Sequence, residues 1–302
     1  MFRRILVPLD GSKTAEVVMP YATALANIYG SQIMLVSVSE SAADASHIYE
    51  TYLNSVAKKL RRQLKEWGET DEQYEVQTKV LVGTPPLEIV GFASKEKISI
   101  IVMASRGSSG EGPWLLGHIA AKVLRTTDRP VLLVRTPASD AALEQKKLVR
   151  KILVPLDGSK AGESALCYAE RLAKTMSAEI VLIEVFEPVG TIGASGIFYT
   201  VRDDEAVRRT LMGYLDTIAQ PIKEQGIKVS SVVTFGNPAS QIMKYVEENS
   251  VDLITISSHG RSGMGRWVFG NVTDKILHTG DVAVLVVRTS EASCDVILSE
   301  HE

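Results

Sequence analysis

The sequence predicts an α/β protein of two consecutive domains, each a doubly wound parallel five-stranded sheet covered by helices on both faces. Two observations lead to this prediction: the 302-residue chain repeats itself, and each copy alternates short apolar runs with amphipathic segments. Apolar strands separated by helices are typical of parallel sheets buried on both faces. Right-handed crossovers then make a doubly wound sheet the natural arrangement.

The repeat is clearest at the start of each copy. Residues 3–13 read RRILVPLDGSK and residues 150–160 read RKILVPLDGSK, so ten of eleven positions match at an offset of 147. Later, residues 107–117 match residues 260–270 at an offset of 153. The second copy therefore has six additional residues before this match, and we expect them to form a longer loop at Gly190–Tyr199.

The two copies also indicate the domain boundaries. Half of the chain is a comfortable size for a domain with its own core, and an Arg-Thr pair follows the last apolar run of each copy. The stretch between the copies is polar and rich in alanine. We expect a first domain at residues 1–137, a linker at 138–149, a second domain at 150–290 and a tail at 291–302.

Hydrophobic periodicity assigns the elements of the first copy in order. Short apolar runs predict strands at residues 4–8, 32–38, 75–81, 98–103 and 131–134. Helical spacing predicts helices at residues 14–29, 47–67, 86–95 and 119–126. The second copy follows the same order from Lys151 to Val287. The last strands, Val131–Val134 and Val282–Val287, are apolar and predicted at sheet edges, where an unpaired strand is an aggregation hazard.

Composition argues against several classes of protein. Lys and Arg total 33 and Asp and Glu total 36, so the basic surplus typical of general nucleic-acid binding is missing. No apolar run approaches the roughly 18–20 residues that span a bilayer, and the N-terminus reaches Asp10 too early to contain a signal peptide. Cys167 and Cys294 are too few for a disulfide framework or a four-cysteine zinc site. We expect a cytoplasmic protein that binds neither nucleic acid nor membranes.

Ligands of doubly wound sheets bind beyond the carboxyl ends of the strands, where the winding reverses. The loops after strands one and four meet there, and the two copies agree best in these loops. After strand four, Gly260 and Gly270 allow close approach of the backbone to a ligand. Asn271 is expected as the N-cap of a helix over 272–277, with the Thr273 hydroxyl in the first turn. Such a helix start is suited to an anion, although a glycine-rich turn that merely caps the helix has the same pattern.

Other nucleotide and catalytic motifs do not match. The chain has no G-x-x-x-x-G-K-[ST] motif, and its glycines follow the fourth strand rather than the first, unlike a dinucleotide fingerprint. After strand one, Asp157 could accept hydrogen bonds from a ribose or an amine, or could cap the helix that begins near Ser159. No G-x-S-x-G elbow and no metal spacing among the five histidines occur, so we assign no catalytic residue and no metal ligand.

Three features together resemble the universal stress protein family. They are V-P-L-D-G-S after strand one, G-x9-G after strand four, and the apolar closing strand that ends in Arg-Thr. The whole chain resembles a tandem member of this family. The resemblance implies two flavodoxin-like sheets of order 3-2-1-4-5 whose last strands pair within the chain. Association of two chains into a homodimer is also expected.

The resemblance implies an adenine nucleotide as ligand, because one branch of the family binds ATP through G-x2-G-x9-G-[ST]. In the second domain Ser257 replaces the first glycine and Asn271 replaces the hydroxyl residue. Asp157 and the backbone near Val185 would serve the ribose and adenine, and the glycine loop with the helix start would hold the phosphates. The expected nucleotide-binding residues of the second domain are Pro155, Asp157, Val185, Ile256, Ser257, His259, Gly260, Gly270, Asn271, Val272 and Thr273.

The first domain departs further from the family pattern. Its motif begins at Ala104 and ends Gly117-His118, so an imidazole occupies the place expected for phosphate. We therefore expect the nucleotide mainly in the second domain. The corresponding candidates in the first domain are Pro8, Asp10, Val38, Met103, Arg106, Gly107, Gly117 and His118.

The resemblance implies a stress-response protein that binds ATP or AMP, with Mg²⁺ as a possible companion, and acts as a nucleotide-dependent signalling or regulatory module. At most weak ATP hydrolysis is expected. One alternative is a slow ATPase or phosphotransferase. The other is a nucleotide-free scaffold in which both sites have decayed, as the departures at Ala104, His118 and Ser257 would allow.

Overall fold

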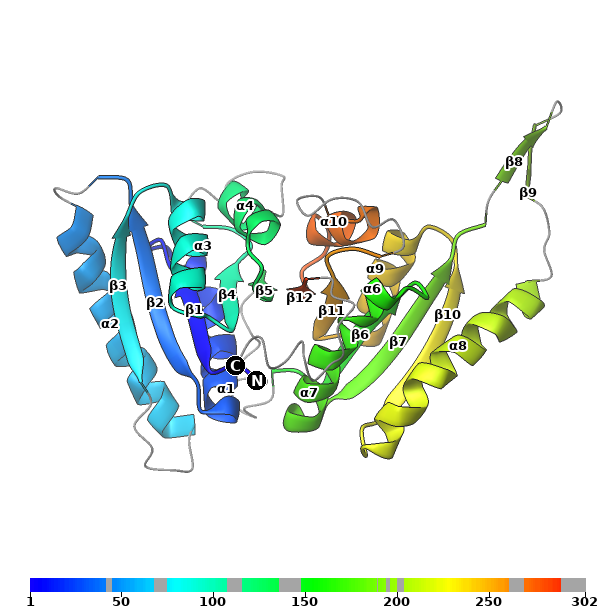
Figure 1. The fold of residues 1–302 in the computed structure, drawn as a ribbon, viewed down its shortest axis with the longest axis horizontal. Coiled ribbons are helices and arrows are strands. Elements are labelled where there is room, and N and C mark those ends of the chain that lie inside the picture. Colours follow the sequence, from blue (N-terminus) through cyan, green and yellow to red (C-terminus); the bar gives the residue numbers. More distant parts are fainter. Residues whose placement is uncertain are drawn as a thin grey trace.

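The structure is a computed structural model that describes residues 1–41, 45–67, 75–107, 116–135, 148–188, 190–193, 196–199, 204–260 and 269–288. Two similar halves stand side by side, with the closing strands of both at the centre (Figure 1). Of the expected linker, only Leu148 and Val149 lie among the described residues, and the expected tail at 291–302 lies outside them. The proposed domain boundaries therefore remain predictions.

The first half has the predicted alternation of strands and helices. Its elements are β1 (Arg4–Pro8), the 3-10 helix η1 (Ala15–Val18), α1 (Met19–Tyr29), β2 (Gln32–Ser39), α2 (Ala45–Trp67), β3 (Val76–Val82), α3 (Pro85–Lys95), β4 (Ile100–Ala104), α4 (His118–Thr126) and β5 (Val131–Val134). The single helix expected at 14–29 is divided into η1 and α1. Pro20 lies in the first turn of α1 and has no N–H to donate to Glu16, so an α-helical ladder cannot run through it.

The second half repeats this order with one addition. Its elements are β6 (Lys151–Leu156), α6 (Lys160–Glu163), α7 (Leu166–Met176), β7 (Glu179–Phe186), β8 (Gly190–Gly193), β9 (Gly196–Tyr199), α8 (Asp204–Glu224), β10 (Val229–Phe235), α9 (Pro238–Asn249), β11 (Leu253–Ser257), α10 (Asn271–Leu277) and β12 (Ala283–Val287). The longer loop expected at 190–199 is wrong: β8 and β9 pair antiparallel there. β-Branched and aromatic residues such as Ile192 and Phe198 favour strands, which the glycine content of the segment concealed.

Ten of the twelve strands in the described parts of the chain form one sheet, in the order β10-β7-β6-β11-β12-β5-β4-β1-β2-β3, and β8 and β9 pair separately. Each half has the predicted parallel 3-2-1-4-5 order. At the centre β5 and β12 run antiparallel, with Leu132 opposite Leu285 and Leu133 opposite Val284. The expected pairing of the closing strands within the chain is therefore confirmed, and neither strand remains an edge.

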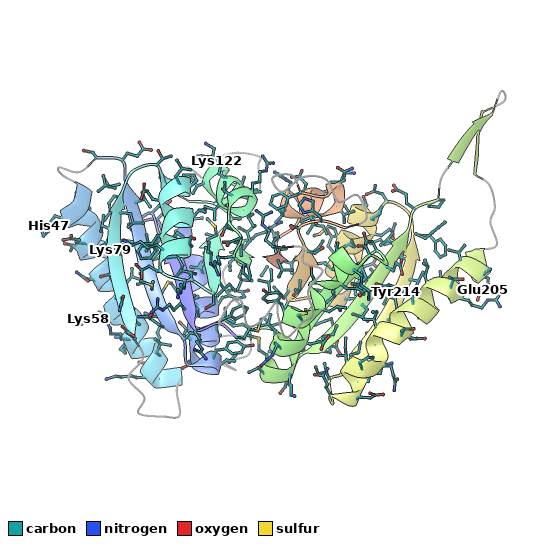
Figure 2. All side chains as sticks on the ribbon, in the orientation of Figure 1. His47, Lys58, Lys79, Lys122, Glu205 and Tyr214 are labelled. Carbon is teal, nitrogen blue, oxygen red and sulfur yellow. The ribbon has the colours of Figure 1, made fainter. Side chains whose placement is uncertain are left out.

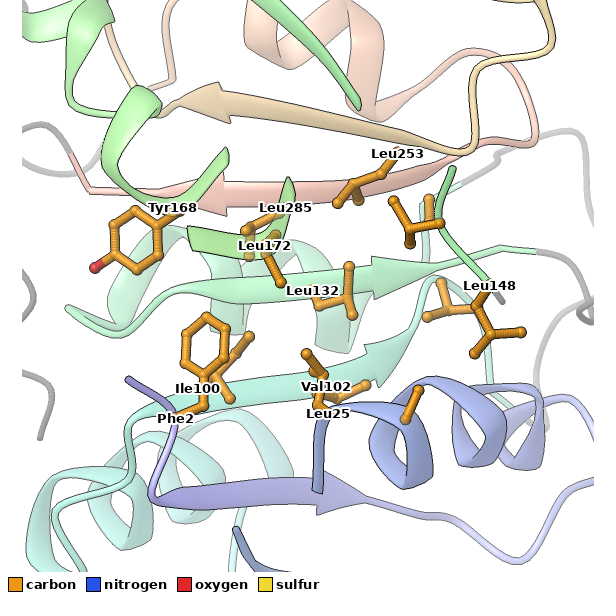
Figure 3. Close-up of a cluster of buried hydrophobic side chains, with 14 of the residues drawn as sticks. Phe2, Leu25, Ile100, Val102, Leu132, Leu148, Tyr168, Leu172, Leu253 and Leu285 are labelled. Carbon is orange, nitrogen blue, oxygen red and sulfur yellow. The ribbon is translucent and has the colours of Figure 1, made fainter. Parts of the chain in front are cut away.

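The junction between the halves has an apolar core on one face of the central strands (Figure 3). Phe2 stacks on Tyr168 across the junction, with ring centroids 6.2 Å apart. Leu132 and Leu285 are buried beside them. Leu148 and Val149, from the end of the expected linker, are also buried in this core. The two halves therefore share apolar burial as well as backbone hydrogen bonds.

Among the residues that the structure describes, no helix is both long enough and apolar enough to cross a membrane.

Because the junction core is shared, we expect the two halves to unfold together. Leu285→Ala removes a side chain that is 1% exposed, and should lower the free energy of unfolding by about 2–5 kcal/mol. Urea unfolding followed by circular dichroism should show one transition at a lower midpoint. Leu87→Ala is the control, because Leu87 is 65% exposed and its loss should change stability by less than about 0.5 kcal/mol. Two separated transitions in Leu285→Ala would contradict a shared core.

Candidate functional site

The turn after the first strand of the second domain is organised by Asp157. Its Oδ1 accepts hydrogen bonds from the Ser159 amide at 3.1 Å and from the Ser159 hydroxyl at 2.6 Å. Ser159 Oγ in turn accepts from the Gly162 amide at 3.0 Å and caps α6. Gly158 has a φ of 76°, a conformation that favours glycine. The capping interpretation therefore holds for one oxygen of Asp157, acting through Ser159.

The first domain builds the same turn. Asp10 Oδ1 accepts from the Ser12 amide at 3.0 Å and from its hydroxyl at 2.6 Å. Ser12 Oγ accepts from the Ala15 amide at 3.1 Å, and Gly11 has a φ of 87°. The repeated D-G-S sequence thus produces the same local structure in both domains, whatever the loops around it do.

The second carboxylate oxygen of each aspartate lies against a glycine of the loop after the fourth strand of its domain, which is called the fourth loop: Gly107 after β4 and Gly260 after β11. A methyl group at Gly260 would overlap Asp157 Oδ2, and one at Gly107 would overlap Asp10 Oδ2. By contrast, a methyl group at Gly270 would lie 3.7 Å or more from its neighbours. Space for a side chain is therefore more restricted at Gly260 than at Gly270.

The fourth loop closes on its own backbone in both domains. The Gly270 amide donates to the Ser258 carbonyl at 3.0 Å, and the Gly117 amide donates to the Ser105 carbonyl at 2.7 Å. Gly270 itself, with extended backbone angles, is the N-cap of α10, so the expected N-cap role of Asn271 is wrong. The bond to Ser258 holds Gly270 at the helix entrance, and Asn271 becomes the first helical residue. The Gly270 amide is thus already hydrogen bonded within the loop.

Two hydroxyl groups of the second domain also hold this loop. Thr273 Oγ1 donates to the Ser257 carbonyl at 2.9 Å, and Thr273 is buried. Ser257 Oγ donates to the His259 carbonyl. His259 is buried, and its Nδ1 lies 3.0 Å from Ser258 Oγ. Thr273 therefore has a structural role at the end of β11, and its expected role in phosphate binding stays a prediction.

The turn and the fourth loop enclose a cavity of about 250 Å³ at the carboxyl ends of β6, β7 and β11. All eleven residues expected from the sequence line it: Pro155, Asp157, Val185, Ile256, Ser257, His259, Gly260, Gly270, Asn271, Val272 and Thr273. Sequence reasoning missed five further lining residues: Leu156, Gly162, Ile183, Pro238 and Ile242. Pro238 follows β10 in a Gly-x-Pro sequence that recurs at Gly83–Pro85. That repeat was the available signal for a third loop at the same edge.

The first domain has a larger cavity, of about 480 Å³, in the corresponding place. It is lined by all eight expected residues: Pro8, Asp10, Val38, Met103, Arg106, Gly107, Gly117 and His118. Tyr49 of α2 and Glu40 after β2 also line it and were not predicted. Tyr49 was missed because helix α2 was not expected to reach the site. His118 is exposed as the first residue of α4, so the imidazole borders this cavity without filling it.

In each domain a tyrosine of the long helix hydrogen bonds to the short helix that follows the turn. Tyr214 of α8 donates to Glu163 Oε1 at 3.2 Å, and Tyr52 of α2 donates to Glu16 Oε1 at 3.1 Å (Figure 2 labels Tyr214). Burial, reinforced by the neighbouring glutamate, raises the pKa of both tyrosines above the ordinary value. Both hydroxyls therefore stay protonated and keep donating at neutral pH.

Within the described parts of the chain, no group of three or more His, Cys, Asp or Glu side chains is placed to hold a metal ion.

Comparison with known proteins places this geometry in a family. The model described as the universal stress protein family matches residues 1–135 and again residues 149–288. The chain belongs to the universal stress protein family. It contains two universal stress protein units in tandem, which agree with the two halves of the sheet.

Two relatives align with most or nearly all of this chain. A universal stress protein of Mycobacterium tuberculosis is 25% identical over 229 residues, which cover 75% of this chain and 73% of that protein. One from Synechocystis sp. is 23% identical over 313 residues, covering 95% of this chain and 100% of that protein. Among solved structures, a universal stress protein from Archaeoglobus fulgidus matches with a TM-score of 0.70 at 21% identity, covering 96% of this chain and 100% of that chain. This likeness supports the fold.

The close approach of Gly260 to Asp157 generates a stability prediction. Gly260→Ala should lower the free energy of unfolding by about 1–3 kcal/mol, because the added methyl displaces a carboxylate that its bonds to Ser159 hold in place. Gly213→Ala is the matched control, since a methyl there meets nothing within 4 Å on the surface of α8. It should stabilise the protein by roughly 0.5–1 kcal/mol through helix propensity. Equal effects of the two substitutions in urea unfolding would rule out the steric account.

Proposed function

We propose that this protein binds an adenine nucleotide, ATP or AMP, in the cavity of the second domain and acts as a nucleotide-dependent regulatory module of the stress response. The observation that carries the proposal is the convergence of eleven residues on one cavity from four segments: the end of β6 with its turn, the end of β7, the end of β11 with its loop, and the start of α10. That cavity lies at the carboxyl edge of a doubly wound sheet, where such folds bind their ligands. Family membership adds support through the ATP-binding motif that the second domain retains in part.

The chemistry of the cavity suits a nucleoside. Ile183, Val185 and Ile256 provide an apolar wall for a base. Asp157 borders the same cavity and is half-buried, so its carboxylate can accept hydrogen bonds from ribose hydroxyls or an exocyclic amine. A volume of about 250 Å³ is just below the range of typical ligand cavities, which run from about 300 to 1,000 Å³. This size favours a compact ligand such as AMP, or ATP with its phosphates directed outward.

The first domain provides a second candidate cavity. It is larger than the cavity of the second domain. Arg106 and His118 border it, and the equivalent residues that border the second cavity are His259 and Asn271. The Arg106 guanidinium offers positive charge that could compensate for the departures from the family motif. We propose weaker or different nucleotide binding there. The stoichiometry of binding will show whether one or both domains bind a nucleotide.

Calorimetry with ATP, AMP and ADP, with and without Mg²⁺, tests the proposal directly. The panel includes cAMP, the ligand of one solved universal stress protein. We expect measurable binding at millimolar nucleotide or below, together with a rise in the thermal midpoint. Asp157→Asn should weaken binding at least about tenfold, because a hydrogen bond to a charged group is worth about 1.5–3 kcal/mol.

The Asp157→Asn variant keeps an oxygen for the Ser159 bonds, so it separates ligand binding from the integrity of the turn. Asp216→Ala, an exposed position on α8, is the charge control and should bind like the wild type. If millimolar nucleotide produces no heat of binding and no thermal shift, the proposal is refuted and the nucleotide-free scaffold is favoured. Release of labelled phosphate that survives repurification and disappears in Gly260→Ala would favour the slow ATPase or phosphotransferase instead.

A further inference from the structure

Each domain ends in an arginine that reaches a helix of the other domain. Arg135 lies directly after β5 and donates hydrogen bonds to the second domain. One acceptor carbonyl is in the last turn of α10 and two lie just after the helix. The Nη2 of Arg135 lies 2.8 Å from the Ile276 oxygen, and its Nη1 lies 2.5 Å from the Gly280 oxygen. Nη1 also donates to the Thr279 oxygen.

The second domain returns the same interaction. Arg288, directly after β12, donates from Nε to the Thr127 oxygen at 2.7 Å and from Nη2 to the Arg125 oxygen at 2.7 Å. Both acceptors lie at the end of α4 in the first domain. An ion pair between Arg125 and Asp274, 3.7 Å apart, joins the two helices directly. Figure 1 shows α4 and α10 beside each other at the centre of the molecule.

These bonds add charged donors to helix ends that backbone amides satisfy in part: the Ile276 oxygen also accepts from the Thr279 amide at 3.2 Å. The last carbonyls of a helix lack partners within the helix and carry the negative end of its dipole. Short helices such as α10, with 7 residues, do not hold their own conformation in water. The planar, charged fork of an arginine can satisfy several such carbonyls at once.

The opposite ends of the same helices form the walls of the cavities. Asn271 and Val272 begin α10 and line the cavity of the second domain. His118 and Ile119 begin α4 and line the cavity of the first domain. Each helix is therefore a short rod that has a cavity at one end and an arginine of the other domain at the other end.

We propose that Arg135 and Arg288 are positioning residues for the nucleotide cavity of the opposite domain: Arg135 holds α10 for the second cavity, and Arg288 holds α4 for the first. Neither arginine borders either cavity, so each acts through its helix. Both cavities are then completed only when the two domains are joined. The part of this inference that concerns ligand affinity rests on the function proposed above.

The electrostatic environment of Arg135 agrees with this arrangement. Burial lowers the pKa of Arg135 to about 10, Asp281 opposes that shift, and Arg106 adds to it. The side chain remains cationic at neutral pH.

The test compares affinities one cavity at a time in the full-length chain. Gly107→Val should disable the first cavity, because the valine would overlap Asp10, so that only the second cavity can bind. Gly260→Val should disable the second cavity in the same way through Asp157, so that only the first can bind. Calorimetry with ATP and AMP then measures the effect of adding Arg135→Gln or Arg288→Gln to each background. We expect Arg135→Gln to weaken the second cavity about tenfold and Arg288→Gln to weaken the first about tenfold.

The crossed pattern is the deciding result. Each arginine variant should change the affinity of its own domain by less than about twofold, and lysine at either position should restore part of the loss through its charge. Arg125→Gln is the control. It removes the ion pair with Asp274 between the domains but keeps the hydrogen bonds that Arg135 and Arg288 donate to the helix ends. Equal weakening of both cavities, or weakening of the arginine's own domain, would overturn the proposal and indicate a general loss of structure.

Hydrogen exchange gives a readout without ligand. In Arg135→Gln the amides of α10 should exchange faster while those of α4 keep their protection, and Arg288→Gln should show the reverse. This crossed exchange with no nucleotide binding would refute the proposed function and retain the positioning role. Uniform exchange across both helices would refute the positioning role even if nucleotide binds.

Discussion

The antiparallel pairing of β5 with β12 is the interaction on which the rest of the molecule depends. It joins two parallel sheets into one and removes the two apolar edges that separate domains would expose. Because each closing strand is preceded by the helix that borders a cavity, the same pairing brings α4 and α10 together. The junction and both candidate sites are therefore built from the same short stretches of chain.

A second constraint recurs in both domains at the turn after the first strand. One aspartate oxygen orders the turn through serine, while the other lies against the first glycine of the fourth loop. A side chain on that glycine would disturb the carboxylate and the turn together. This shared geometry explains why D-G-S and the following glycine motif are both kept in a first domain whose helix start has changed.

The sequence predicted which loops meet at the two cavities but not the local hydrogen bonds within those loops, and the binding roles of the lining residues stay predictions. All expected residues line the two cavities, because the carboxyl ends of parallel strands meet at one edge. Asn271 was misplaced by one position because the Gly270–Ser258 bond joins residues twelve apart across a loop. Tyr49 and Ile242 were missed because they come from helices whose orientation toward the cavity depends on packing.

The sequence by itself determined the tandem repeat, the fold class, the order of strands and helices, and the loops that meet at the cavities. These follow from periodicity and repetition, which are local or directly comparable along the chain. Only the tertiary structure decided which groups face each other across the junction. Examples are the hydrogen bonds from Arg135 to the end of α10 and from Arg288 to the end of α4. Those contacts join residues more than 140 positions apart, so no local pattern encodes them until the closing strands have paired.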